Sequence, residues 1–447
     1  MNDSYWSRVL KARISRRRAL TTMGAAAAGA AFLAACGGDD DDGGSASQPT
    51  QAPGAQPTQA PGAQPTQVAL EPAPSEIKIG AVVPLTGRYA AGGAQIQNGY
   101  QLAIDAINAE GGIENQRYSG KSLLKLELLD DASDPNQTVQ RLETLFSQDV
   151  MAYLGGFGSD LHAAAAPIAE KNSIPYIGVA FALYKIHQQG YKYLFSPFVK
   201  SPGISKSWFD LMDAQSPKPA KLAFFPEKTD WGAEMRDYWR QEASARGYEV
   251  VVDEEYAPGA SDLSPLILAA KSAEADAILS LPNPPDGALL QRQLKELDYT
   301  PKITFIVRAA DAPTWGTNFG KDGDFVIVAP GWSPDLKYDG VAEFNAAHQE
   351  KFGTPPGAVA GPAQVAATVL ADAISRAEEL TPDGIRDALV ATDLASTIMG
   401  PVSFKDDGSG DVLNVSVQWQ GGKLVSVWPT DVAGGSLVYP APPFDER

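Results

Sequence analysis

Residues 77–112 read IKIGAVVPLTGRYAAGGAQIQNGYQLAIDAINAEGG, and this stretch decides the fold class. Its first seven residues are almost all apolar and rich in Ile and Val, which predicts a buried strand over 77–83. Apolar residues then recur at helical spacings of four, three and four, at Ile96, Tyr100, Ala103 and Ile107. Gly111 and Gly112 follow and predict the end of that helix. A buried strand followed by an amphipathic helix is the repeating unit of an α/β protein.

The same alternation continues along the chain. Further strands are predicted at 123–129, 150–154, 174–179, 222–225, 249–252, 277–281, 303–307 and 325–328. Helices are predicted at 135–146, 159–171, 202–214, 231–245, 263–272, 287–297, 340–352, 362–380 and 382–390, and hairpin-like segments at 397–404, 412–418 and 423–427. So many strands exceed what one open sheet normally holds. We therefore expect two α/β lobes facing each other across a cleft, which the loops at the carboxyl ends of the strands line.

Length and composition limit the classes of function. A chain of 447 residues predicts two or three domains. Its 36 basic and 54 acidic residues give a net charge of −18, which disfavours nucleic acid as a partner. A single cysteine excludes an intrachain disulfide framework, and three scattered histidines make a metal centre unexpected.

The first 36 residues have the parts of an export signal. Three arginines at 16–18 precede a weakly apolar stretch at 19–35 that is short for a membrane span. The arginines resemble a twin-arginine signal, but Ala19 stands where most such signals have Phe, so the general secretory route stays open. The letters LAACG at 33–37 resemble a bacterial lipoprotein cleavage box, which implies a lipid on Cys36; the alternative is a chance buried cysteine.

Residues 37–75 are predicted to be a disordered tether. An acidic run at 39–42 is followed by QPTQAPGA repeats from Gln48 and Gln56, with no apolar periodicity that could build a core. Together with the lipid, this tether would hold an exported protein at the outer face of the cytoplasmic membrane or elsewhere in the cell envelope. The sequence does not decide which membrane holds the anchor.

Five short motifs carry a family resemblance. They are INAEGG at 107–112, DD at 130–131 with DP at 134–135, DWG at 230–232, GASD at 259–262 and GPV at 400–402. Over about residues 76–428 their order and spacing resemble the leucine/isoleucine/valine-type periplasmic binding proteins, which are the substrate-binding subunits of ABC importers.

The resemblance implies an α/β, type I periplasmic-binding-protein fold of two Rossmann-like lobes joined by a three-strand hinge. Lobe 1 is expected to comprise 76–200 plus 332–404, and lobe 2 to comprise 201–331 plus 405–447. Such a protein captures a solute by hinge closure, without a cofactor or a reaction, and delivers it to permease and ATPase subunits. We expect it to act as a monomer.

The resemblance also places ligand-binding residues. Ser159, behind the glycine-rich run at 155–158, falls on the serine whose hydroxyl meets the ligand carboxylate. A glycine-rich turn that opens a helix suits an anion on physical grounds, and the alternative is that Ser159 only caps the helix. Ala180 falls on a backbone-contact position, whereas Ala182 replaces a carboxylate-binding threonine. Trp231 falls on an aromatic cleft residue; the alternative is an ordinary buried Trp.

Charged residues of the second lobe leave two alternatives open. Asn283 lies near the position of a family tyrosine, and the acidic partner of an amino acid's ammonium group falls near Ala309. Arg308 would favour an anion in the cleft, whereas Asp311 would supply the carboxylate for an ammonium group.

The first lobe adds a cation and several rings. Arg88 is either a ligand-facing cation or a solvated surface residue. Tyr89, Phe157, Phe181 and Tyr184 lie on successive loops and could form a stacking wall for a ring-bearing ligand. The alternative is that these rings only fill the space under the loops.

Rival functions are less well supported. Ser159 and His162 are one helical turn apart, but no Gly-x-Ser-x-Gly elbow surrounds them, so we do not expect an enzyme. The glycines at 155–158 lack the Gly-x-Gly-x-x-Gly spacing of a dinucleotide site. The prediction is therefore a solute-binding lipoprotein for an amino acid or an aromatic or other organic acid. The main alternative is a ligand-sensing module that signals through a partner protein.

Overall fold

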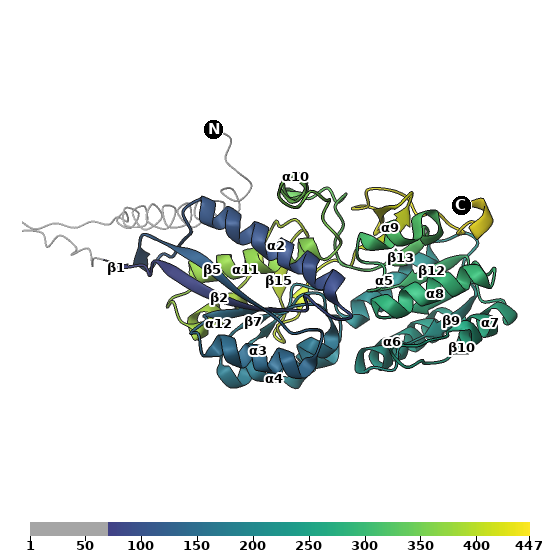
Figure 1. The fold of residues 1–447 in the computed structure, drawn as a ribbon, viewed down its shortest axis with the longest axis horizontal. Helices are drawn as coiled ribbons and strands as arrows, with labels where there is room; N and C mark the ends of the chain where they lie inside the picture. The colour runs from purple at the N-terminus through teal and green to yellow at the C-terminus, as the bar shows by residue number, and fades with distance from the viewer. Residues whose placement is uncertain (1–69) are drawn as a thin grey trace, which may run out of the picture.

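The computed structural model describes residues 70–447. The predicted export signal, Cys36 and nearly all of the predicted tether lie outside these described residues. Two sheets, each covered by helices, lie at opposite ends of an elongated body (Figure 1). Within residues 70–447 no helix has the length and apolar character needed to cross a membrane.

The first sheet has six strands in the order β3-β5-β2-β6-β7-β8. They are β2 (Glu76–Val83), β3 (Ile113–Glu114), β5 (Lys121–Asp130), β6 (Ala152–Leu154), β7 (Tyr176–Ile177) and β8 (Leu194–Phe195). All neighbours are parallel except β3 and β5. The helices of this end are α2 (Ala90–Ala109), α3 (Pro135–Phe146) and α4 (Ser159–Asn172), joined late in the chain by α10 (Val341–Phe352), α11 (Ala360–Arg376) and α12 (Pro382–Val390).

The second sheet has seven strands in the order β10-β9-β11-β12-β13-β17-β18. Its parallel part is β9 (Lys221–Phe225), β10 (Glu249–Asp253), β11 (Ala277–Ser280), β12 (Ile303–Ile306) and β13 (Val326–Val328). The antiparallel strands β17 (Ser416–Gln420) and β18 (Lys423–Trp428) complete it. Its helices are α5 (Ser201–Asp213), α6 (Asp230–Arg246), α7 (Ser264–Ser272), α8 (Pro284–Glu296) and α9 (Thr314–Phe319).

Smaller elements complete the described chain. They are the pair β1 (Glu71–Pro72) and β4 (Tyr118–Ser119), the sheet of β14 (Asp393–Leu394), β15 (Val402–Phe404) and β16 (Gly410–Asp411), and three 3₁₀ helices, η1 (Tyr184–Gln189), η2 (Gly320–Gly323) and η3 (Phe444–Glu446). The chain passes three times between the two ends, after β8, after β13 and between β16 and β17. The predicted limits of the two lobes stay a prediction.

Local chemistry explains the helix limits. Asp134 accepts hydrogen bonds from the backbone N–H groups of Asn136 and Gln137, so α3 begins at the DP pair. Thr229 caps α6 in the same way through Gly232 N–H, and Gly247 ends that helix in the left-handed region. The strand–helix alternation predicted from the sequence is confirmed, with helix α3 at its predicted limits.

Helix α11, late in the chain, is a buried part of the first lobe and packs against α2. Its residues 360–374 are all buried. A methyl group at Gly99 on α2 would overlap the carbonyl oxygen of Ala360, so α2 and α11 touch backbone to backbone there. The Asn115 side-chain amide donates to the carbonyl oxygens of Ile374 and Ala377 and fixes the end of α11.

Candidate functional site

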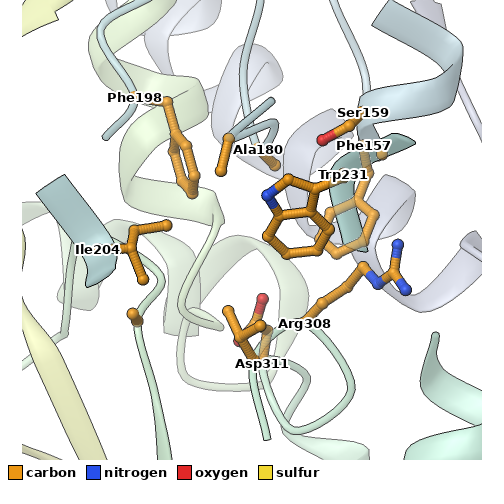
Figure 2. Close-up of a pocket in the computed structure, with 12 residues that line it drawn as sticks. Phe157, Ser159, Ala180, Phe198, Ile204, Trp231, Arg308 and Asp311 are labelled. Carbon is orange, nitrogen blue, oxygen red and sulfur yellow. The ribbon is translucent and has the colours of Figure 1, made fainter. Parts of the chain in front are cut away.

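A cleft with an empty volume of about 350 Å³ lies where the two lobes meet (Figure 2). It is lined by Phe157, Gly158, Ser159, Ala180, Ala182, Phe198, Ile204, Trp231, Val307, Arg308, Asp311 and Ala329. Most of these residues follow the carboxyl ends of parallel strands in the two sheets, which is where α/β sheets bind ligands. The lining side chains that the two lobes contribute are buried, so the cleft is closed in this structure.

Ser159 begins helix α4 on the first wall. The N-cap is Gly158 at φ +109°, so the Ser159 hydroxyl does not cap the helix. A β-carbon at Gly158 would lie 2.8 Å from the ring of Tyr89, which leaves room only for glycine. Ser159 Oγ accepts a hydrogen bond from Leu183 N–H at 3.4 Å and keeps its own proton for another acceptor. The hydroxyl and the amino end of α4 together form an anion-accepting corner.

Trp231 is the second residue of α6 on the opposite wall. Its indole N–H donates to Ser201 Oγ at 3.2 Å, and that hydroxyl donates to the carbonyl of Ala182 at 2.8 Å. The indole, Phe157 and Phe198 face the same space in Figure 2. Ile204 adds a further apolar side chain. The cleft therefore offers mainly apolar contact to the body of a ligand.

Arg308 lines the cleft, but its charge is already paired. The guanidinium forms an ion pair with Glu227 at 2.7 Å, and the exposed fractions of the two side chains are 7% and 2%. It also donates to the carbonyl oxygens of Leu281 at 2.9 Å and Pro282 at 3.2 Å. In Figure 2 the guanidinium points away from Phe198. Because a neighbouring carboxylate balances this cation, it attracts a ligand anion only weakly.

Asp311 is the unbalanced carboxyl group of the cleft. It is 4% exposed, and its Oδ1 atom has no hydrogen-bond partner within the described residues. Burial raises the pKa of Asp311 from the ordinary 3.8 to about 7, although the positive charge of Arg308 opposes that rise. A positively charged ligand group would satisfy the free oxygen and favour ionisation.

Four predicted residues lie outside the cleft lining. Arg88 forms an ion pair with Asp160 near the surface, where its side chain is 41% exposed. The Tyr89 hydroxyl donates to Asp160 at 3.1 Å and accepts from Arg308 Nη1 at 3.4 Å, so Tyr89 lies directly behind the cleft wall. The remaining two residues, Phe181 and Asn283, contact other side chains.

The Phe181 ring stacks on His162 and His187, with centroid distances of 4.3 and 5.6 Å. Asn283 caps α8 by accepting from Asp286 N–H and donates to Glu227 at 2.8 Å, so it touches the cleft only through the Glu227–Arg308 pair.

Sequence reasoning missed several residues that shape the site. The loop residues Phe198, Val307 and Ala329 and the α5 residue Ile204 belong to no motif. Glu227 directly follows the buried strand β9 and Pro226, and an acidic residue at that edge was the available signal.

Lys200 is a second missed residue. It is 6% exposed, donates to Phe181 O at 2.9 Å and Ser196 Oγ at 2.7 Å, and lies 3.4 Å from the centre of the Phe181 ring. Lys200 forms no ion pair with any carboxylate between residues 70 and 447. Burial lowers the pKa of Lys200 well below its usual value.

Ser159 and His162 are each engaged with other groups. His162 Nδ1 donates to the carbonyl of Gly158 at 2.7 Å, and the ring is fully buried against Phe181. Burial lowers the pKa of His162 to about 3, so the ring stays neutral. The described residues contain no group of three His, Cys, Asp or Glu side chains placed to hold a metal ion.

Comparisons with known proteins extend these observations. The sequence model of a family described as periplasmic binding protein matches residues 76–423. The Leu/Ile/Val-binding protein homolog 8 of Brucella melitensis is 27% identical over 380 residues, which cover 80% of this chain and 92% of that protein.

Solved structures share the fold. A branched-chain amino acid transporter substrate-binding protein from Streptococcus pneumoniae, in complex with isoleucine, has a TM-score of 0.70 and 22% identity and covers 82% of this chain and 100% of that one. A solute-binding protein of an ABC transporter from R. palustris, in complex with benzoate, has a TM-score of 0.69 and 18% identity and covers 81% of this chain and 98% of that one. The predicted two-lobed, type I α/β fold is confirmed.

Proposed function

We propose that this chain, which belongs to the periplasmic binding protein family over residues 76–423, captures a small carboxylate-bearing solute in the closed cleft. The solute is an amino acid or an aromatic or other organic acid, and an ABC permease with its ATPase receives it. Relatives in complex with isoleucine and with benzoate support this range of ligands. Family membership also supports an extracytoplasmic location and a binding protein rather than an enzyme.

The unpartnered Oδ1 atom of Asp311 favours one class of solute within that range. In an α-amino acid, a carboxylate would accept from the Ser159 hydroxyl and the amino end of α4, and the ammonium group would meet Asp311. Arg308 does not compete, because Glu227 already balances its charge. The side chain would then lie against Trp231. Of the two classes, an apolar α-amino acid fits this arrangement best.

The N-terminal segment supports a further part of the proposal. Cys36 would carry the lipid that anchors the protein, and residues 37–75 would let the monomer move between solute and permease. Replacement by C36S should release the protein from the membrane fraction, and mass spectrometry of the wild type should find an acylated Cys36. An unmodified Cys36 in membrane-bound protein would refute the anchor.

A thermal-shift screen tests solute capture. Full-length protein carrying C36S is heated with amino acids, including isoleucine, and with aromatic and short carboxylates, including benzoate. A solute at 100 times its dissociation constant stabilises the folded state by about 2.7 kcal/mol. We expect apolar amino acids to raise the melting temperature.

Two matched variants locate the binding. Ser159→Ala should lose about 1.5–3 kcal/mol of solute binding, the usual value of a hydrogen bond to a charged group. Ser244→Ala, an exposed serine on α6, should bind as the parent does. If no solute stabilises the protein, solute capture is wrong and the sensing module that signals through a partner replaces it.

A further inference from the structure

Glu234, one turn along α6 from the cleft residue Trp231, reaches from one lobe to the other. It lies on α6, beside the second sheet, and its two carboxylate oxygens accept hydrogen bonds from backbone N–H groups of η1, which follows β7 of the first sheet. The Tyr184 N–H bonds to Oε1 and the Lys185 N–H bonds to Oε2, both at 2.8 Å. Figure 1 places α6 in one lobe and β7 in the other.

This contact supplies hydrogen-bond acceptors that η1 does not provide for its own first N–H groups. The first N–H groups of a helix have no partner within the helix and need an outside acceptor. Leu183 occupies the N-cap position of η1 and provides no side-chain hydrogen bond. A carboxylate that accepts two N–H groups is a strong, charge-assisted partner. Hinge opening would remove this acceptor, because Glu234 belongs to the opposite lobe.

The segment that meets Glu234 also forms a wall of the cleft. Ala180 and Ala182 line the cleft, and the next N–H group, from Leu183, donates to Ser159 Oγ. Three successive N–H groups, those of 183, 184 and 185, therefore connect the proposed ligand-binding serine with the opposite lobe. A solute that orders this segment favours the Glu234 contact, and the contact in turn favours the solute-binding geometry.

Other polar contacts also cross between the lobes. Ser201 Oγ, on the first residue of α5 beside the crossover that follows β8, donates to the Ala182 carbonyl at 2.8 Å. Arg308 Nη1 donates to the neutral Tyr89 hydroxyl at 3.4 Å, which is long for a hydrogen bond. The two 2.8 Å bonds of Glu234 are shorter and involve an ionised acceptor. The Glu234 contact is thus a stronger polar link than the contact between Arg308 and Tyr89.

We propose that Glu234 is a positioning residue that latches the closed form and so sets the affinity of the cleft without touching the solute. This inference rests on the proposed solute-capturing function, which requires opening and closing. A latch that acts without solute keeps part of the ligand-free protein closed. Solute affinity then rises in proportion to that closed fraction.

Distance measurements on ligand-free protein test the latch. Spin labels are placed on full-length protein carrying C36S at cysteines introduced by Gln140→Cys on α3 and Gln241→Cys on α6, both exposed positions. Double electron–electron resonance then reports the closed and open populations. Glu234→Gln retains the size of the side chain but loses the charge and one acceptor oxygen. We expect the ratio of closed to open molecules to fall about fivefold.

The control removes the same charge from the same helix. Asp237 is one turn from the latch, has a side chain that is 70% exposed and approaches Arg240 only at 4.0 Å, so Asp237→Asn should leave the distances unchanged. Urea unfolding checks that each variant is folded. The proposal is overturned if Glu234→Gln matches the parent, or if the ligand-free parent has no closed population. Because no solute is added, these outcomes do not depend on whether the protein binds isoleucine or benzoate.

Discussion

Replacement of Asp311 by Asn should change how stability depends on pH. In the folded protein burial raises the pKa of Asp311 from 3.8 to about 7, so the folded state holds this proton more tightly than the unfolded chain does. Folding is then penalised as pH rises through that window, and the full penalty applies above pH 7. A rise of about three pH units at 1.36 kcal/mol each gives at most about 4 kcal/mol. The amide side chain that the exchange introduces cannot ionise and avoids this penalty.

Urea unfolding followed by tryptophan fluorescence measures the effect. The free energies of unfolding of parent and Asp311→Asn are compared at pH 4 and pH 8, without solute. We expect their difference to shift by up to about 4 kcal/mol in favour of the variant at pH 8. Comparing the two pH values cancels the direct effect of the amide group. Asp237→Asn, on an exposed position, serves as the control. A difference that is the same at both pH values would refute the account of Asp311.

Three further exchanges test the surroundings of the cleft. Glu227→Gln leaves the buried Arg308 guanidinium without its counter-charge, and we expect a loss of about 3–5 kcal/mol in urea unfolding; an unchanged midpoint would contradict the pairing. Trp231→Phe removes the indole hydrogen bond to Ser201, and isothermal titration with isoleucine should show about three- to tenfold weaker binding; equal affinity would exclude Trp231 from the cleft's function. Burial lowers the pKa of Lys200, so the folded state binds this proton less tightly than the unfolded chain and stability increases with pH up to the unfolded pKa. Lys200→Met should therefore gain stability relative to the parent as pH falls from 9.5 to 7, and a gain that does not grow would contradict the lowered pKa of Lys200.

Local chemistry made much of the fold predictable. The DP pair at 134–135 places a capping carboxylate before a proline, and α3 begins there. The strand predictions succeeded because the buried parallel strands are short apolar runs bounded by turn residues. The segment predicted at 397–404 was only partly right, since Thr397 and Gly400 close a tight turn and strand β15 spans Val402–Phe404.

The site was less predictable, because its chemistry depends on partners far apart in the chain. Ser159 and Trp231 could be placed from their motifs, and both line the cleft. The choice between Arg308 and Asp311 could not be made, since it depends on Glu227, which lies 81 residues before Arg308. Neither the periodicity of the sequence nor the spacing of its motifs indicates that Arg308 and Glu227 form an ion pair. Phe181 was expected in the cleft, but its ring turns into the lobe between two histidines.

Calorimetric titration of the full-length protein with isoleucine at pH 6 and pH 8 tests the central claim most directly. If Asp311 receives the ammonium group, the binding-competent carboxylate rises from about one-tenth to about nine-tenths of the molecules between these pH values, given a pKa of about 7. The account predicts about tenfold tighter binding at pH 8, and no such gain in Asp311→Asn. An absence of binding, or an affinity that is the same at both pH values in the parent, would contradict it.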